Sequence, residues 1–161
     1  MNNKLICLFS FVLVLSIAGN ASAELVLHLP LENAQNPTDA SANPATIVLH
    51  GSLNSVEGKL DNALEFNGDN ANCLEVISTA KLEGMSALSI AAWVLPRNIA
   101  GREGMSIVSK RVAWADGDVY NLFTYDGQLV NGRINANNVN IGLSTTALED
   151  DTWYHIALVF N

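Results

Sequence analysis

Basic residues are scarce in this 161-residue chain, which has 8 lysines and arginines against 16 acidic residues and a formal net charge of -8. Nucleic-acid binding needs basic side chains that neutralise phosphates, so this balance disfavours DNA and RNA as partners. Only 15% of the residues are charged and 49% are hydrophobic, which is more apolar than disordered chains are. The length corresponds to one domain, or to part of one.

Cysteine is also rare, since the chain has only two, which excludes a disulfide scaffold. The three histidines, His28, His50 and His155, are far apart in the sequence and show no metal-ligand spacing with one another or with Cys73. Glycine-rich phosphate loops and lysine-containing nucleotide motifs are missing. These absences disfavour nucleotide chemistry and histidine-cysteine metal sites.

The N-terminus is apolar and ends in small residues. Lys4 precedes an apolar run over residues 5–19, and the tripeptide Ala21-Ser22-Ala23 stands before Glu24. This pattern predicts a secretory signal peptide at residues 1–23 and a mature domain at residues 24–161. The run is shorter than the ~20 residues that span a bilayer, so we expect no stable membrane span after cleavage. The expected location is secreted, cell-surface or periplasmic.

Hydrophobic residues in the mature region alternate with a period of two, and sustained helical periodicity is absent. Asp126-Gly127 favours a two-residue reversal between antiparallel strands. Short strands without intervening helices predict an all-β fold, an antiparallel two-sheet jellyroll sandwich. The predicted strands are residues 25–31, 46–50, 63–66, 73–77, 87–95, 105–110, 119–125, 128–134, 139–145 and 152–160.

The segment at residues 152–160 is apolar on both faces, which is typical of a central strand. The chain stops one residue later, at Asn161, with no returning strand to cover it. A covered strand with no neighbour leaves an apolar edge exposed. We therefore expect a sandwich that is incomplete at its C-terminus, as in a truncated gene product.

Six ordered landmarks give the chain a family resemblance. They are residues 27–32, 39–43, 62–68, 88–96, 107–110 and 152–160. Together they resemble laminin-G-like domains of the concanavalin A-like lectin and glucanase superfamily. The resemblance implies a secreted jellyroll sandwich, usually noncatalytic, that binds glycans or protein surfaces and often holds a structural calcium ion. The family pattern continues beyond Phe160 with strands that are absent here.

The calcium expectation concerns one loop. The family's Asp-x-Ser-Gly-Asn pattern matches the stretch from Asp39 to Asn43, so these two residues are the candidate metal ligands. Calcium takes six to eight oxygen ligands, which such a loop can offer in part. Ala42 stands where the family has glycine, which makes a positive φ costly. The alternative is that Asp39 and Asn43 only cap backbone groups of the loop.

Glycan binding needs an accessible aromatic ring beside polar groups. Trp114 lies between two predicted strands, with Asp116 and Asp118 close by in the sequence, so these three are the candidate ligand-binding residues. The alternative is that Trp114 folds over the edge of the sandwich while the aspartates form a turn. Trp93 and Trp153 lie within predicted strands and are assigned to core packing.

The function expected from these features is a secreted, noncatalytic module that binds a polysaccharide or an extracellular protein. A structural or adhesion segment, or a remnant of a larger extracellular protein, is the alternative. A glycoside hydrolase is disfavoured: Glu149 and Asp151 have the spacing of a carboxylate pair, but they lie in a turn with nothing apolar to raise a pKa. The chain is therefore predicted not to be an enzyme.

Overall fold

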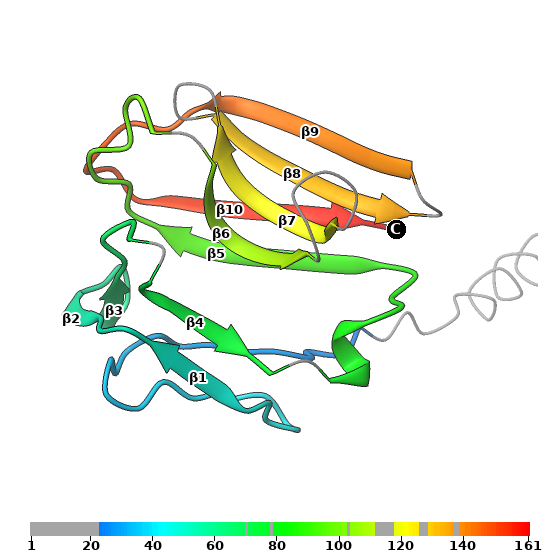
Figure 1. Cartoon of the computed structure of the whole chain (residues 1–161), viewed down its shortest axis with the longest axis horizontal. Coiled ribbons are helices and arrows are strands. Elements are labelled where there is room, and N and C mark those ends of the chain that lie inside the picture. The colour runs from blue at the N-terminus through cyan, green and yellow to red at the C-terminus, as the bar shows by residue number, and fades with distance from the viewer. Residues whose placement is uncertain are drawn as a thin grey trace, which may run out of the picture.

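The computed structural model of the chain describes residues 23–69, 71–77, 79–102, 104–111, 118–125, 129–136 and 139–161. Within these ranges the chain forms strands and one short 3₁₀ helix, which confirms the all-β fold (Figure 1). The elements are β1 (Ile47–His50), β2 (Asn54–Glu57), β3 (Asn62–Glu65), β4 (Cys73–Val76), η1 (Ala80–Leu82), β5 (Leu88–Val94), β6 (Met105–Arg111), β7 (Asp118–Tyr125), β8 (Leu129–Ala136), β9 (Val139–Ala147) and β10 (Tyr154–Phe160).

The larger half of the molecule is a sandwich of two antiparallel layers. One layer is the four-stranded sheet β6-β7-β8-β9, and the other is the pair β10-β5. Apolar side chains from both layers form one core, as alternation along each strand requires. The buried members of this core are Ile99, Tyr120, Leu122, Val130, Ile134, Leu148, Ile156 and Leu158.

The predicted strands at residues 87–95 and 152–160 correspond to β5 and β10, which pair with each other. β5 and β10 align over their whole length, from Tyr154 opposite Val94 to Phe160 opposite Leu88. Ile156 and Leu158 point into the core, and Ile90 packs against it. The inner face of β5 therefore lies against the same core as that of β10.

The smaller half holds two further strand pairs, β1 with β4 and β2 with β3, on the side of β5 away from β10 (Figure 1). Its core consists of Ala34, Leu53 and Leu64, with partly buried leucines around them. In β4 the side chains alternate, so that Cys73 and Glu75 are exposed while Leu74 and Val76 are half-buried. This alternation is typical of a strand with one covered face.

Two strand predictions were wrong. Residues 25–31 form no strand, because no described strand pairs with them. The segment ends at Pro30, which lacks an N–H, and at Leu31, which has a φ of 62°. The segment is held instead by single bonds, such as that from the Ala40 N–H to the His28 carbonyl at 2.7 Å. Strand β2 was missed because its sequence Asn-Ser-Val-Glu has a single apolar residue and therefore no alternation.

One further prediction needs correction, and another falls outside the described residues. β7 and β8 pair antiparallel as expected, with Tyr125 aligned with Leu129, but the reversal predicted at Asp126-Gly127 lies outside the described residues. The last strand begins at Tyr154 and pairs only with β5 among the described residues. Its outer residues His155, Ala157 and Val159 are exposed, so only one of its faces is covered.

The N-terminal prediction falls almost entirely on residues 1–22, which lie outside the described ranges. Among the residues that are described, no helix has the length and apolar character needed to cross a membrane.

Candidate binding site

The outer face of the β5–β10 pair carries the candidate site. Because side chains alternate in direction along a strand, the residues between the core positions point away from the four-stranded sheet. The register places Trp93 opposite His155 and Ala91 opposite Ala157. The result is a face of small side chains with an aromatic pair at one end.

Trp93 is the main feature of this face, with 47% of its surface exposed. The His155 ring lies 5.1 Å from the Trp93 ring, centroid to centroid, and is tilted by 54°. The ammonium of Lys59, from the connection between β2 and β3, lies 5.4 Å from the ring centroid. The negative face of an indole attracts such cations. An accessible aromatic ring is thus flanked by two groups that can hydrogen-bond to a ligand. We call Trp93, His155 and Lys59 the Trp93 surface.

An ion-pair network ties the strands near this surface together. Arg97, just after β5, lies 3.2 Å from the Glu65 carboxylate on β3 and 3.6 Å from that of Asp151. The Asp151 N–H donates to the Pro96 carbonyl at 2.8 Å, and Asp150 accepts from the Ile99 N–H at 3.2 Å. The side chains of Asp150 and Asp151, in the acidic turn at residues 149–151 before β10, therefore contact the segment that follows β5.

Trp93 was assigned to the core from the sequence, and that assignment was wrong. Its alternation partners, Ser89 and Ala91, are small and are both exposed in the structure. Its position in the sequence indicated the outer face, because Trp93 alternates with the core positions of β5. His155 alternates with the core positions of β10 in the same way. Trp153, in contrast, is half-buried.

The predicted ligand-binding residues are only partly described. Trp114 and Asp116 lie outside the described residues, so their placement stays a prediction. Asp118 begins β7, where it aligns with Arg111 of β6, and nothing is described of its side chain. The structure therefore neither brings these three residues together nor separates them.

The four-stranded sheet offers a less accessible polar surface. Asn121 on β7 is 1% exposed, and its side-chain oxygen accepts no hydrogen bond from the described residues. Its ladder neighbours are Ser109 and Arg133. Phe123, on the same face, is buried and has the Arg133 guanidinium 5.6 Å from its ring centroid. Because Asn121 and Phe123 are buried whereas Trp93 is exposed, the Trp93 surface is the more accessible of the two.

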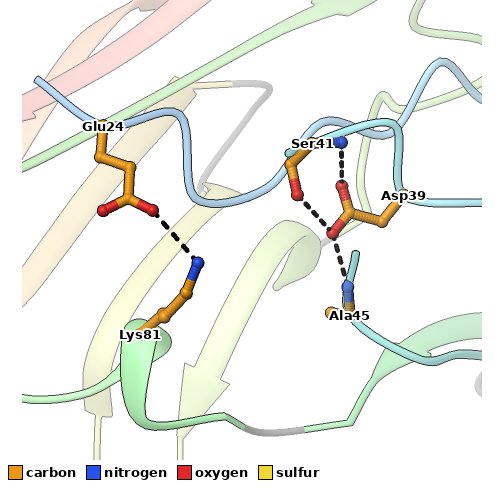
Figure 2. Close-up of polar contacts among 5 residues, drawn as sticks. All are labelled: Glu24, Asp39, Ser41, Ala45 and Lys81. Atoms are coloured by element: carbon orange, nitrogen blue, oxygen red, sulfur yellow. Dashed lines mark hydrogen bonds and ion pairs between the residues drawn. The ribbon is translucent and has the colours of Figure 1, made fainter. Parts of the chain in front are cut away.

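Asp39, one of the two predicted calcium ligands, is buried in its loop and fully hydrogen-bonded. One carboxylate oxygen, Oδ1, accepts from the N–H groups of His28 at 2.9 Å and Ser41 at 2.8 Å. The other, Oδ2, accepts from the Ser41 hydroxyl at 2.9 Å and the Ala45 N–H at 2.7 Å. Figure 2 shows the carboxylate between Ser41 and Ala45. The Asp39 carboxylate therefore holds its loop against the extended segment that contains His28.

The electrostatics of Asp39 follow from these contacts. Burial raises its pKa, but hydrogen bonds from the His28, Ala45 and Ser41 N–H groups and from the Ser41 hydroxyl outweigh burial. The pKa falls from 3.8 to about 2. The carboxylate is therefore ionised at neutral pH, with its charge balanced by donors of its own loop.

These contacts do not fit a calcium ligand. A carboxylate has about four lone-pair sites, and the four donors to Asp39 occupy them. The second predicted ligand, Asn43, is exposed, and the described residues contain no group of three or more histidines, cysteines or acids that could hold a metal.

The calcium site at Asp39 and Asn43 stays a prediction, and a thermal scan of the full chain tests it directly. Because the donors of Asp39 are internal, we expect 1 mM calcium to leave the Tm unchanged relative to the same protein in EDTA. A metal bound only by the folded state would raise the Tm in proportion to its affinity. A rise of several degrees with calcium, absent with magnesium, would show that a site exists.

Comparisons with known proteins bear on the fold. No family model and no curated protein matches the chain. The structure is similar to the crystal structure of the binding domain of Paraclostridial Mosquitocidal Protein 1, with a TM-score of 0.68 at 16% sequence identity. The likeness covers 86% of this chain but only 36% of that one, so this chain spans about a third of its length. At this identity the likeness shows that the two chains share an all-β sandwich fold.

Proposed function

We propose that this chain is a noncatalytic binding module of laminin-G-like type, exported by its N-terminal signal segment, and that the Trp93 surface binds a carbohydrate. The exposed indole of Trp93, on a rigid strand pair, is the observation that carries this proposal. Sugar rings present apolar C–H faces that pack on aromatic rings, while their hydroxyls need hydrogen-bonding groups around the ring. His155 and Lys59 provide such groups at the Trp93 surface.

Two further points support a binding role. The similar solved structure is itself described as a binding domain. Of the two carboxylates with the spacing of a catalytic pair, Glu149 and Asp151, the second lies 3.6 Å from the Arg97 side chain. In this proposal the connection that carries Trp114, Asp116 and Asp118 contributes additional contacts to the ligand.

Replacing Trp93 with alanine is expected to weaken polysaccharide binding about tenfold. Burial of about 50 Å² of indole at about 25 cal/mol per Å² is worth ~1.3 kcal/mol, which corresponds to roughly that factor. Affinity electrophoresis of the full chain in gels containing soluble polysaccharides, laminarin and agarose among them, measures the change.

Tyr125→Ala is the matched control, because Tyr125 is 48% exposed but lies on the other layer. Its binding should match that of the unmodified chain. A Trp93→Ala chain that binds normally while Trp114→Ala loses binding would move the site to the β6–β7 connection. Failure to bind any polysaccharide would remove the carbohydrate from the proposal.

A further inference from the structure

Lys59 lies over the Trp93 ring without a carboxylate partner of its own. Its ammonium is 5.4 Å from the ring centroid, and no described carboxylate forms an ion pair with it. Lys81, Arg97 and Lys110, in contrast, each approach a carboxylate to 3.2 Å or less. The chain has 16 acidic residues against 8 basic ones, so a shortage of acids does not explain this difference. The donors of the Lys59 ammonium are therefore available to a ligand.

The turn between β2 and β3 sets the position of Lys59. The Gly58 N–H donates to the Asp61 carbonyl at 2.9 Å, and Asp61 has a φ of 48°. A Cβ added at Gly58 would lie 2.7 Å from backbone atoms of Asn62, so the turn has this tight form only with glycine there. Figure 1 shows the β2–β3 pair beside the C-terminal end of β5, which is the end that carries Trp93. Lys59 therefore reaches the ring from a separate strand pair.

The charge near the ring is set by this ammonium more than by the acidity of the whole chain. The carboxylates of Glu65 and Asp151 already pair with Arg97, at 3.2 and 3.6 Å. Charges farther away are screened by salt over about 8 Å at physiological ionic strength. One local cation suits a ligand with a single anionic group at each contact, whereas nucleic acids need many cations and stay disfavoured.

A sugar ring that packs on the side of the indole covered by Lys59 must displace the ammonium. A neutral sugar would displace it without offering a charged partner, and a cationic ligand would be repelled by it. A sugar with a carboxylate at its edge lets the ammonium exchange its contact with the ring for a charge-assisted hydrogen bond. The arrangement therefore favours an acidic sugar over a neutral one.

From this geometry we infer that the ligand of the Trp93 surface is a polysaccharide that contains uronic acids, and that Lys59 selects it by pairing with the sugar carboxylate. This inference rests on the proposed binding of a carbohydrate at Trp93. In the complex the sugar ring packs on the indole, and Lys59 moves from the face of the indole to the edge of the sugar.

Polygalacturonate and its methyl ester test the inference, because the two polymers share a sugar backbone and differ in the free carboxylate. Isothermal titration of the full chain at neutral pH and low salt should show about fivefold tighter binding of polygalacturonate than of the ester, as a favourable exposed ion pair provides. Lys59→Gln should abolish this preference and leave the affinity for the ester within about twofold of that of the unmodified chain. Lys59→Arg, which keeps the charge, should keep the preference.

Lys81→Gln is the matched control, because it removes the same charge from a lysine that pairs with Glu24. Its preference for polygalacturonate should equal that of the unmodified chain. A preference that survives Lys59→Gln, or that Lys81→Gln weakens equally, would overturn the role of Lys59.

The inference and the proposed function fail in different ways. Equal affinity for the two polymers that Trp93→Ala still weakens, or binding of neutral polysaccharides alone, would overturn the inference and leave the proposed function intact. Absence of binding to every polysaccharide, acidic and neutral, would overturn both.

Discussion

Replacing Gly132 with valine is expected to lower the free energy of unfolding by about 2–3 kcal/mol. A Cβ at this position would lie 2.6 Å from one methyl carbon of Leu158 and 3.3 Å from the other. Leu158 is 7% exposed and belongs to the core between the layers, so its side chain has little space in which to move. The branched side chain must therefore separate β8 from β10. Urea denaturation of the full chain measures the loss.

A double-mutant cycle separates this contact from a general effect on the strand. Leu158→Ala alone should cost about 2–5 kcal/mol, because it leaves a cavity in the core. Gly132→Val combined with Leu158→Ala should cost less than the sum of the two single changes, since the valine fills part of that cavity. Additive costs would show that the two layers do not meet at these residues.

Replacing Asp39 with alanine is expected to cost about 3 kcal/mol of stability at pH 7. Three backbone N–H groups and one hydroxyl lose their acceptor, and each buried donor left unpaired costs about 1 kcal/mol or more. Asp69→Asn is the matched control, because Asp69 also accepts from a residue two positions ahead, the Ala71 N–H, but is exposed. The control should cost under about 1 kcal/mol.

The effect of Asp39 also depends on pH in a definite direction. Its folded pKa of about 2 lies below the ordinary value of 3.8, so the folded state holds this proton less tightly than the unfolded state. The contribution is fully present above about pH 3.8 and is lost as the pH falls through about 2. After allowance for solvent screening, the ionisation is worth on the order of 1–2 kcal/mol. The difference in free energy of unfolding between the unmodified chain and Asp39→Ala should therefore be smaller at pH 2.5 than at pH 6. A difference that is the same at both pH values would assign the loss to packing instead.

The ion pair between Glu24 and Lys81 supports the same N-terminal segment at a second point. Their side chains approach to 3.1 Å, and Figure 2 places this contact beside the Asp39 loop. The Glu24 side chain is largely exposed and that of Lys81 is half-buried, so the pair contributes little to stability. The Asp39 carboxylate is thus the stronger of the two attachments.

Much of the fold follows from alternation along the sequence. The predicted strands at residues 87–95 and 105–110 correspond to β5 and β6, and burial alternates along β5, where Ile90 is half-buried and Ala91 is exposed. Alternation states which residues share a face, but it does not state which strand lies beside which. The absence of a strand at residues 25–31 and the presence of β2 both depend on neighbours distant in the sequence.

The candidate site was harder to predict for the same reason. Asp39 was identified from its loop pattern, and the alternative in which it caps backbone groups agrees with its hydrogen bonds. Trp93 was placed in the core because large aromatic side chains are usually buried. Only the pairing of β5 with β10, which puts small residues around it and His155 opposite it, shows that its ring is accessible.

Local patterns of this chain therefore suffice for its class of fold, its strand segments and the inward faces of β5 and β10, because a period of two is a property of neighbouring residues. The exposure of Trp93 and the approach of Gly132 to Leu158 arise from how segments far apart in the chain are arranged. Such contacts depend on which strands pair and which layers face each other, and the burial pattern of a single strand is compatible with many such arrangements.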